Sequence, residues 1–226
     1  MPFPGGIDSL ANGTLLLAAV AAFLYLLVQD RPPSWRRTAV KAAAVALLAV
    51  LAFIEGGPLL LVAALLASAA ADALLAQTGG EEEGEGFFVA GLAGFLLAHL
   101  AYVALFAIAG GWLEILSVQP WRLALPALAT LATLLLSARL LPAAGPALRM
   151  PVAAYGLAIL AMVWLSATVP VPLVMIGAAL FFVSDAILAT EKFLLSPSSP
   201  HRGWTGPAVW LLYFLGQATI TLGFLL

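Results

Sequence analysis

The sequence has no cysteine, only two histidines and few charged residues, which make up 9% of its 226 positions. Without cysteine the chain can form no disulfide, thiolate nucleophile or thiolate metal site. Two histidines, one of them His201 in a predicted loop, are too few for a zinc amidase built on several imidazoles. The net charge of −2 is too small to indicate a polyanionic partner, so nucleic-acid binding is not expected.

Apolar residues take the place of the missing charge. Hydrophobic residues account for 64% of the chain, whereas soluble domains contain about 45–50% apolar and about 25% charged residues. The chain is therefore expected to be an integral membrane protein. Residues 1–12 contain no lysine or arginine, so the positive region of a cleavable signal is missing, and the first hydrophobic stretch is expected to remain as a span.

Eight stretches approach the length of about 20 apolar residues that crosses a bilayer as a helix. The connections between them are short and rich in proline and glycine, and none is long enough to separate domains. We therefore predict an all-α, polytopic membrane protein in which residues 1–226 form a single bundle of about eight transmembrane helices. The predicted spans are Leu10–Val28, Thr38–Ile54, Pro58–Ala76, Phe87–Ala109, Trp121–Leu141, Pro151–Thr168, Pro172–Ala189 and Pro207–Leu226.

The basic residues indicate how these spans are oriented. Only Arg122 flanks an even-numbered connection, and the other eight lie in or beside odd-numbered ones. Because lysine and arginine favour the cytoplasmic side, the odd connections are predicted to be cytoplasmic and both termini to lie outside, in the inner cell membrane. The acidic run Glu81–Glu85 contributes little to this rule and is expected to be a solvated loop. The eight basic residues are Arg31, Arg36, Arg37, Lys41, Arg139, Arg149, Lys192 and Arg202.

Two aspartates lie inside predicted spans, Asp72 in the third and Asp185 in the seventh. A carboxylate at membrane depth costs about 3 kcal/mol on insertion scales, so such residues usually face a bundle interior and serve a pathway or a reaction. The alternative is an aspartate close enough to a helix end to reach the headgroups. Asp72 is a candidate for this alternative, since it lies only four residues, roughly 6 Å, before Ala76.

The predicted topology brings further polar side chains to the same depth. Spans three and seven both run toward the cytoplasm, which places the two aspartates in the inner-leaflet half, and spans four and eight start from that side. Residues three or four apart share a helix face, so a single pocket opening toward the inner leaflet is predicted. Its other members would be Lys41, Ser68, His99, Tyr102, Tyr213 and Gln217.

Each of these residues also has a simpler interpretation. An interior histidine is often only hydrogen-bonded, tyrosines often pack or lie at the interface, and serines such as Ser68 and Ser184 often serve as small helix-contact residues. Lys41 could be the last positive-inside charge. The case for a site therefore depends on the convergence of several costly groups at one predicted depth.

The two aspartate segments match each other. Asp72–Ala76 reads DALLA and Asp185–Ala189 reads DAILA, and each follows a proline, Pro58 or Pro172, at a similar distance. A chain this rich in alanine and leucine can produce such agreement by chance. A true duplication would be a parallel repeat of four helices plus four, with one aspartate from each half.

Several segments resemble the signature of the YhhN family, the lysoplasmalogenases. The blocks around His99 and around Ser184-Asp185 are the most specific parts, and the resemblance covers about residues 41–217. The matching segments are Ser68–Asp72, Phe88–Tyr102, Pro151–Val152, Tyr155, Met162, Gly177–Phe193 and Tyr213–Gln217.

Two positions depart from the family pattern. Ala71 stands where the family has glycine before the aspartate, and Ala42 stands where it has proline after Lys41. The change at Ala71 concerns local helix packing more than the chemistry of the neighbouring carboxylate.

The resemblance implies an eight-span enzyme that hydrolyses the vinyl ether bond of lysoplasmalogens to a fatty aldehyde and glycerophosphoethanolamine or glycerophosphocholine. This reaction begins with protonation of the carbon–carbon double bond, which gives an oxocarbenium ion that water attacks. Burial and a neighbouring negative charge both favour the protonated form of a carboxyl group, so Asp72 and Asp185 would share one proton and divide the roles of acid and stabilising anion. Neither a metal nor a cofactor is required.

The remaining site residues would bind the substrate. His99, Tyr213 and Gln217 would orient the water or the glycerol hydroxyl, and Lys41 would hold the phosphate. The expected partners are a lysophospholipid substrate and membrane lipids, with headgroup preference and oligomeric state left open. The full substrate-binding set is Lys41, Ser68, His99, Tyr102, Tyr155, Ser184, Tyr213 and Gln217.

Two other functions use similar residues. An intramembrane aspartyl protease also has two aspartates at membrane depth, but Ala71 and Ser184, which precede the aspartates here, do not resemble its tyrosine- and glycine-bearing motifs. A proton-coupled transporter, or another lipid-binding membrane protein, would use the same aspartates as relays. Transporter sites usually lie near the bilayer midplane, whereas the predicted cluster lies toward one leaflet.

Overall fold

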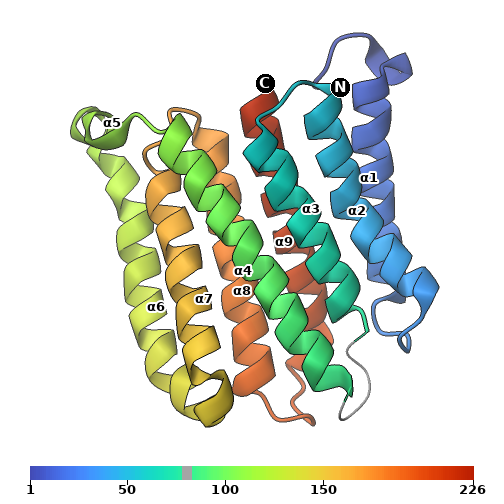
Figure 1. Ribbon diagram of the computed structural model, residues 1–226, viewed down its shortest axis with the longest axis vertical. Helices are drawn as coiled ribbons and strands as arrows, with labels where there is room; N and C mark the ends of the chain where they lie inside the picture. The colour runs from blue at the N-terminus through green and yellow to red at the C-terminus, as the bar shows by residue number, and fades with distance from the viewer. Residues whose placement is uncertain (78–82) are drawn as a thin grey trace. The chain divides into compact units, whose positions relative to one another are not determined.

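A computed structural model describes residues 1–77 and 83–226, and every regular element in those ranges is helical (Figure 1). This confirms the all-α prediction. The helices are η1 (Gly6–Asp8), α1 (Leu10–Val28), α2 (Trp35–Ile54), α3 (Leu59–Leu75), α4 (Glu83–Ala109), α5 (Trp112–Val118), η2 (Pro120–Leu123), α6 (Ala124–Ala143), α7 (Gly145–Ser166), α8 (Pro172–Phe193) and α9 (Arg202–Leu225).

Seven helices in the described part of the chain are long and apolar enough to cross a membrane. They are α1, α2, α4 and α6–α9, and they correspond to seven of the eight predicted spans. The remaining span, α3, has 17 residues, a rise of about 25 Å that is near the lower limit for crossing the hydrocarbon core. The chain is thus a polytopic helical membrane protein.

Two predicted helix starts differ from the structure by more than one turn. Pro151 and Pro207 were expected to begin spans, but they lie inside α7 and α9. A proline removes one backbone hydrogen bond from a helix interior, and transmembrane helices tolerate this loss. Pro172, in contrast, occupies the first turn of α8 as predicted.

The acidic run was predicted to be a solvated loop. Glu81 and Glu82 lie outside the described residues, whereas Glu83 begins α4. The helix α4 therefore starts one turn before the predicted span, whereas the stretch of it that can cross a membrane, Gly86–Ala109, begins within one residue of the prediction.

The chain divides into two compact units. Unit 1 comprises residues 1–105 and 224–226, and unit 2 comprises residues 106–223. Asp72 belongs to the first and Asp185 to the second. The single domain and the four-plus-four repeat stay predictions.

Unit 1 is built from consecutive antiparallel helices. α1 packs on α2 and α2 packs on α3 (Figure 1). Serine side chains cap the starts of two of them, since Ser9 accepts a hydrogen bond from the Asn12 amide and Ser34 accepts one from the Arg37 amide. Ser34 therefore fixes where α2 begins, two turns before Lys41.

The contact between α3 and α4 explains why alanine is tolerated at residue 71. A Cβ atom added at Gly94 of α4 would lie 3.0 Å from the Cβ of Ala71. The missing side chain of Gly94 therefore leaves the space that the methyl group of Ala71 occupies. Helices α3 and α4 can therefore still approach closely, because the glycine lies on α4 instead of α3.

In unit 2, α8 and α9 approach each other closely. A Cβ atom added at Gly177 would lie 2.8 Å from the carbonyl oxygen of Gly216, and one added at Gly216 would lie 2.9 Å from the carbonyl oxygen of Gly177. Such contacts require glycine on both helices. They fix the position of α9 against the helix that carries Asp185.

Arg122 of unit 2 is buried, with 1% of its surface exposed. Its guanidinium donates hydrogen bonds to the carbonyl oxygens of Val169 and Pro170, at 2.7 and 2.9 Å, in the connection between α7 and α8. This basic residue was the single exception to the predicted charge asymmetry. Its position is explained by a structural role, because it satisfies the carbonyl groups of a tight turn.

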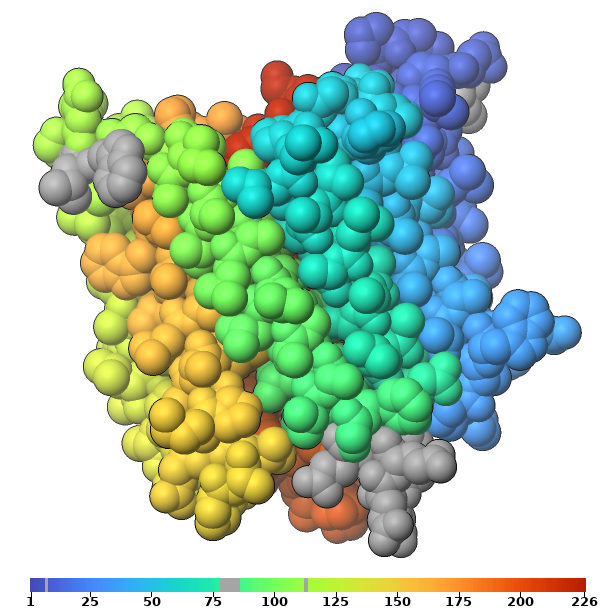
Figure 2. Space-filling model, in the orientation of Figure 1, coloured from blue at the N-terminus to red at the C-terminus, as the bar shows by residue number. Residues whose placement is uncertain are grey.

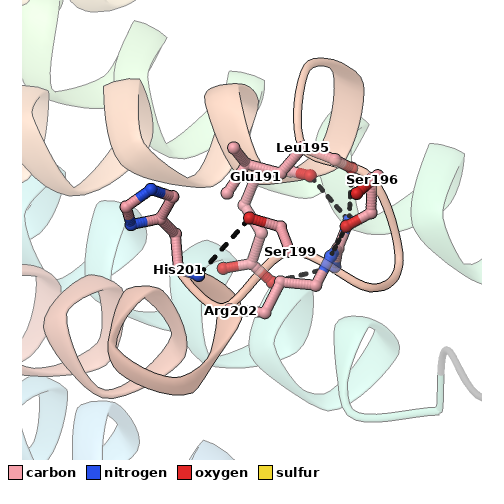
Figure 3. A network of polar contacts seen from close by, with 6 residues as sticks. All are labelled: Glu191, Leu195, Ser196, Ser199, His201 and Arg202. Carbon is pink, nitrogen blue, oxygen red and sulfur yellow. Dashed lines mark hydrogen bonds and ion pairs between the residues drawn. The ribbon is translucent and has the colours of Figure 1, made fainter.

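The connection between α8 and α9 is closed by Arg202 (Figure 3). Its guanidinium donates to the carbonyl oxygens of Glu191, Leu195 and Ser196 at 2.9–3.0 Å and lies 3.4 Å from Oε1 of Glu191. A cation at the carboxyl end of α8 also interacts favourably with the helix dipole. Arg202 therefore sets the start of α9 against the end of α8.

Candidate functional site

Asp72 forms a buried ion pair within unit 1. Nζ of Lys41 on α2 lies 3.3 Å from Oδ1 of Asp72 on α3, and the two side chains are 12% and 2% exposed. An aspartate that reaches the headgroups would be accessible, so the burial of Asp72 favours the interior position. The removal of charged groups from water is compensated only by close pairing, and Lys41 supplies that pairing.

The register of α2 against α3 positions this pair. Gln77 Nε2 donates to Thr38 Oγ1 at 2.8 Å, and Arg37 Nη1 donates to the carbonyl oxygen of Ala76 at 3.3 Å. Together with the Lys41–Asp72 pair, these contacts connect the beginning of α2 to the end of α3 through polar groups.

Tyr25 on α1 completes the surroundings of Lys41. The lysine Nζ lies 5.6 Å from the centre of the Tyr25 ring, and the tyrosine is buried. A cation above an aromatic face is stabilised by the ring quadrupole. Sequence reasoning missed Tyr25, whose only signal was a tyrosine inside the first span.

Three further predicted residues lie inside unit 1. Ser68 precedes Asp72 by one turn on α3, and His99 and Tyr102 share a face of α4; all three are fully buried. His99 Nδ1 donates to the carbonyl oxygen of Phe95 at 2.7 Å. In a neutral imidazole this leaves Nε2 as the acceptor, so His99 is suited to receive a hydrogen bond from a hydroxyl group or water.

Asp185 has a different partner within unit 2. The hydroxyl group of Tyr155 on α7 donates to Oδ2 of Asp185 on α8 at 2.6 Å. A hydrogen bond this short is typical of an O–H donor on a carboxylate. Both side chains are partly exposed.

The other predicted residues of unit 2 lie where α8 meets α9. Ser184 Oγ donates to the carbonyl oxygen of Val209 at 2.8 Å, which matches its simpler interpretation as a helix-contact residue. Tyr213 packs edge-on against Phe181, with 5.2 Å between ring centres. Gln217, one turn beyond Tyr213 on α9, is fully buried.

The structure thus pairs Lys41 with Asp72 and Tyr155 with Asp185, each pair within one unit. The common pocket for both aspartates stays a prediction. Among the described residues, no group of three or more histidines, aspartates or glutamates is placed to hold a metal ion.

Comparison with known proteins supports the resemblance seen in the sequence. The model of the YhhN family matches residues 36–224, a range that includes both aspartates and their partners. No curated protein and no solved structure matches the chain. The chain belongs to the YhhN family.

Proposed function

We propose that this protein is a membrane-embedded lysoplasmalogenase, which hydrolyses the vinyl ether bond of lysoplasmalogens. The observation that carries the proposal is the pairing of two aspartates in apolar helices with polar residues of neighbouring helices, Lys41 with Asp72 and Tyr155 with Asp185. Ionisable residues in transmembrane segments are costly and usually functional. Membership of the YhhN family supports the same assignment.

The reaction consumes one water molecule and needs two carboxyl groups in different states. One aspartic acid transfers its proton to the alkenyl carbon, and the resulting oxocarbenium ion is stabilised by the other aspartate as a carboxylate. Water attacks the cation and returns a proton to the first aspartate. The hemiacetal then collapses to a fatty aldehyde and the glycerophospho-alcohol.

The partners of the aspartates suit this chemistry. The ammonium of Lys41 compensates negative charge on Asp72 where both side chains are largely buried, so the attraction between them is weakly screened. The hydroxyl of Tyr155 orients the carboxyl group of Asp185. In this proposal His99, Tyr213 and Gln217 position the attacking water or the glycerol hydroxyl, and Ser68, Tyr102 and Ser184 hold the helices that carry the site.

The proposal is tested with the purified protein in detergent. A lysoplasmalogen should release a free aldehyde without added cofactor and in the presence of a metal chelator. The saturated alkyl ether analogue should bind without reacting, because it has no double bond to protonate. Release of a fatty acid from an ester lysolipid, with no aldehyde from the vinyl ether, would instead indicate an acyl hydrolase. Proton-coupled uptake into liposomes without hydrolysis would indicate a transporter.

We further propose that both termini lie outside the cytoplasm in the inner membrane. The support is the clustering of basic residues at odd connections, together with the structural role of Arg122. In the cysteine-free chain, Ser9→Cys and Gly111→Cys should react with an impermeant thiol reagent applied to intact cells, whereas Gly84→Cys should not. Labelling of residue 84 alone would reverse the orientation.

A further inference from the structure

The guanidinium of Arg37 lies near the buried ion pair of unit 1. Its Nη1 donates to the carbonyl oxygen of Ala76, while Lys41, four residues later on α2, contacts Asp72, four residues earlier on α3. Four residues correspond to about 6 Å of helix rise. Arg37 is therefore one turn closer than Lys41 to the helix ends that are proposed to face the cytoplasm.

Most of the guanidinium donors of Arg37 make no hydrogen bond in the described part of the chain. A guanidinium has five N–H donors, and among the described residues Nη1 is the one guanidinium nitrogen of Arg37 that makes a hydrogen bond. The Nε atom is buried and has no hydrogen-bond partner, and no described acidic side chain pairs with Arg37. Buried donors in native proteins are as a rule satisfied. The side chain is only partly buried, so an anion at the membrane surface can reach the guanidinium.

The chemistry of Arg37 favours a phosphate group. The planar fork of a guanidinium matches two phosphate oxygens, whereas an ammonium is a single point charge. In an alkenyl lysophospholipid, six covalent bonds separate the ether-bearing vinyl carbon from phosphorus, about 7 Å when extended at ordinary bond lengths. This length matches one turn of α2. A lipid with its chain in the bilayer also points its phosphate from Asp72 toward the helix ends.

We propose that Arg37 binds the phosphodiester of the lysophospholipid, one helical turn outside the Lys41–Asp72 pair. This inference rests on the proposed function, because it takes Asp72 as the place where the vinyl ether reacts. Lys41, which the sequence suggested for the phosphate, is engaged by the carboxylate of Asp72.

Arg36 provides a matched control. It carries the same charge at the adjacent position, but its guanidinium lies 5.5 Å from the ring of Trp35, which is 74% exposed. Figure 2 shows the start of α2, in blue, at the surface of unit 1. If only the positive charge of this region mattered, Arg36 and Arg37 would be equivalent.

The test compares R37Q and R36Q on two vinyl ethers, an alkenyl lysophosphocholine and an alkenylglycerol without phosphate. R37Q should raise KM for the lysophosphocholine about tenfold, the equivalent of one lost charge-assisted hydrogen bond. It should leave kcat and the alkenylglycerol reaction unchanged. R36Q should alter neither substrate. R37K should recover part of the loss, and it takes the place of R37Q in this comparison if R37Q does not fold.

Equal losses on both substrates, or equal losses in R36Q and R37Q, would overturn the inference. A binding measurement tests the phosphate site separately from the proposed function. In it, the saturated alkyl lysophosphocholine is titrated into the purified protein. About tenfold weaker binding to R37Q, for one lost charge-assisted hydrogen bond, supports the phosphate site even if the wild type cleaves no vinyl ether, in which case only the proposed function fails. Unchanged affinity of R37Q for this lipid overturns the phosphate site, whether or not the wild type cleaves the vinyl ether. If R37Q loses the binding of inorganic phosphate but binds the lipid as tightly as the wild type, Arg37 is a site for free phosphate and the lipid proposal is overturned.

Discussion

The two aspartates occupy comparable positions in units 1 and 2 but have different partners. Each partner comes from the preceding long helix, and the separations along the chain are nearly equal: 72 − 41 = 31 residues for Lys41 and Asp72, and 30 for Tyr155 and Asp185. This is the arrangement that a four-plus-four repeat predicts. The partner in unit 1 is a cation and the partner in unit 2 is a neutral hydroxyl.

The different partners suit the two aspartates to different roles in the proposed reaction. Asp72 is almost fully buried beside an ammonium, whereas Asp185 is partly exposed beside a phenol. Acid and stabilising-anion roles require two carboxyl groups in different environments. The different partners of the two aspartates supply such a pair for the proposed reaction.

The largest effect is expected from the aspartates themselves. Asp72→Asn and Asp185→Asn should each lower kcat by at least about 100-fold, because a positioned acid or base contributes about 10²–10⁴-fold. The double variant should be scarcely slower than either single one, since residues that act as a unit are not additive. Aldehyde release from folded protein measures this. If one variant keeps most of its activity, that aspartate has no part in the reaction.

The ion pair of unit 1 should dominate stability. Lys41→Met removes the cation beside a buried carboxylate and should destabilise the protein by about 3–5 kcal/mol. Adding Asp72→Asn should restore much of this loss, because the carboxylate is then gone as well. Unfolding in mixed detergent micelles measures both variants. An additive double variant would show that the two residues do not interact.

The helix contacts of the two units should respond differently to a methyl group. Gly94→Ala in unit 1 meets the side chain of Ala71, so its overpacking cost of about 1–3 kcal/mol should disappear in Gly94→Ala combined with Ala71→Gly. Gly216→Ala in unit 2 meets backbone atoms of α8 and has no such single rescue. The same unfolding assay measures the stability of each variant. If a single compensating substitution on α8 rescued Gly216→Ala as fully as Ala71→Gly rescues Gly94→Ala, the described packing would be contradicted.

The helices could be predicted from the sequence because a bilayer requires long apolar segments with internally satisfied backbones. The ends of α1 agree with the prediction, whereas those of α7 and α9 depended on prolines that a helix interior can accommodate. The aspartates were recognisable because charge is rare at membrane depth. Their partners were not, since the pairing of Lys41 with Asp72 depends on the register between two helices, and Tyr25 offered no periodic or charge signal.

The smallest effect should come from the hydrogen bond of unit 2. Tyr155→Phe keeps the ring and removes the donor to Asp185, and hydrogen bonds between transmembrane helices contribute on average about 0.6 kcal/mol, with a maximum of about 1.7 kcal/mol. A double-mutant cycle with Asp185→Ala, which removes the acceptor, isolates this contribution, provided that each single variant folds. The coupling energy should fall within that range and well below the one for Lys41 and Asp72. A coupling in unit 2 as large as that in unit 1 would remove the contrast between a cationic and a neutral partner, and the two aspartates would then have equivalent supports.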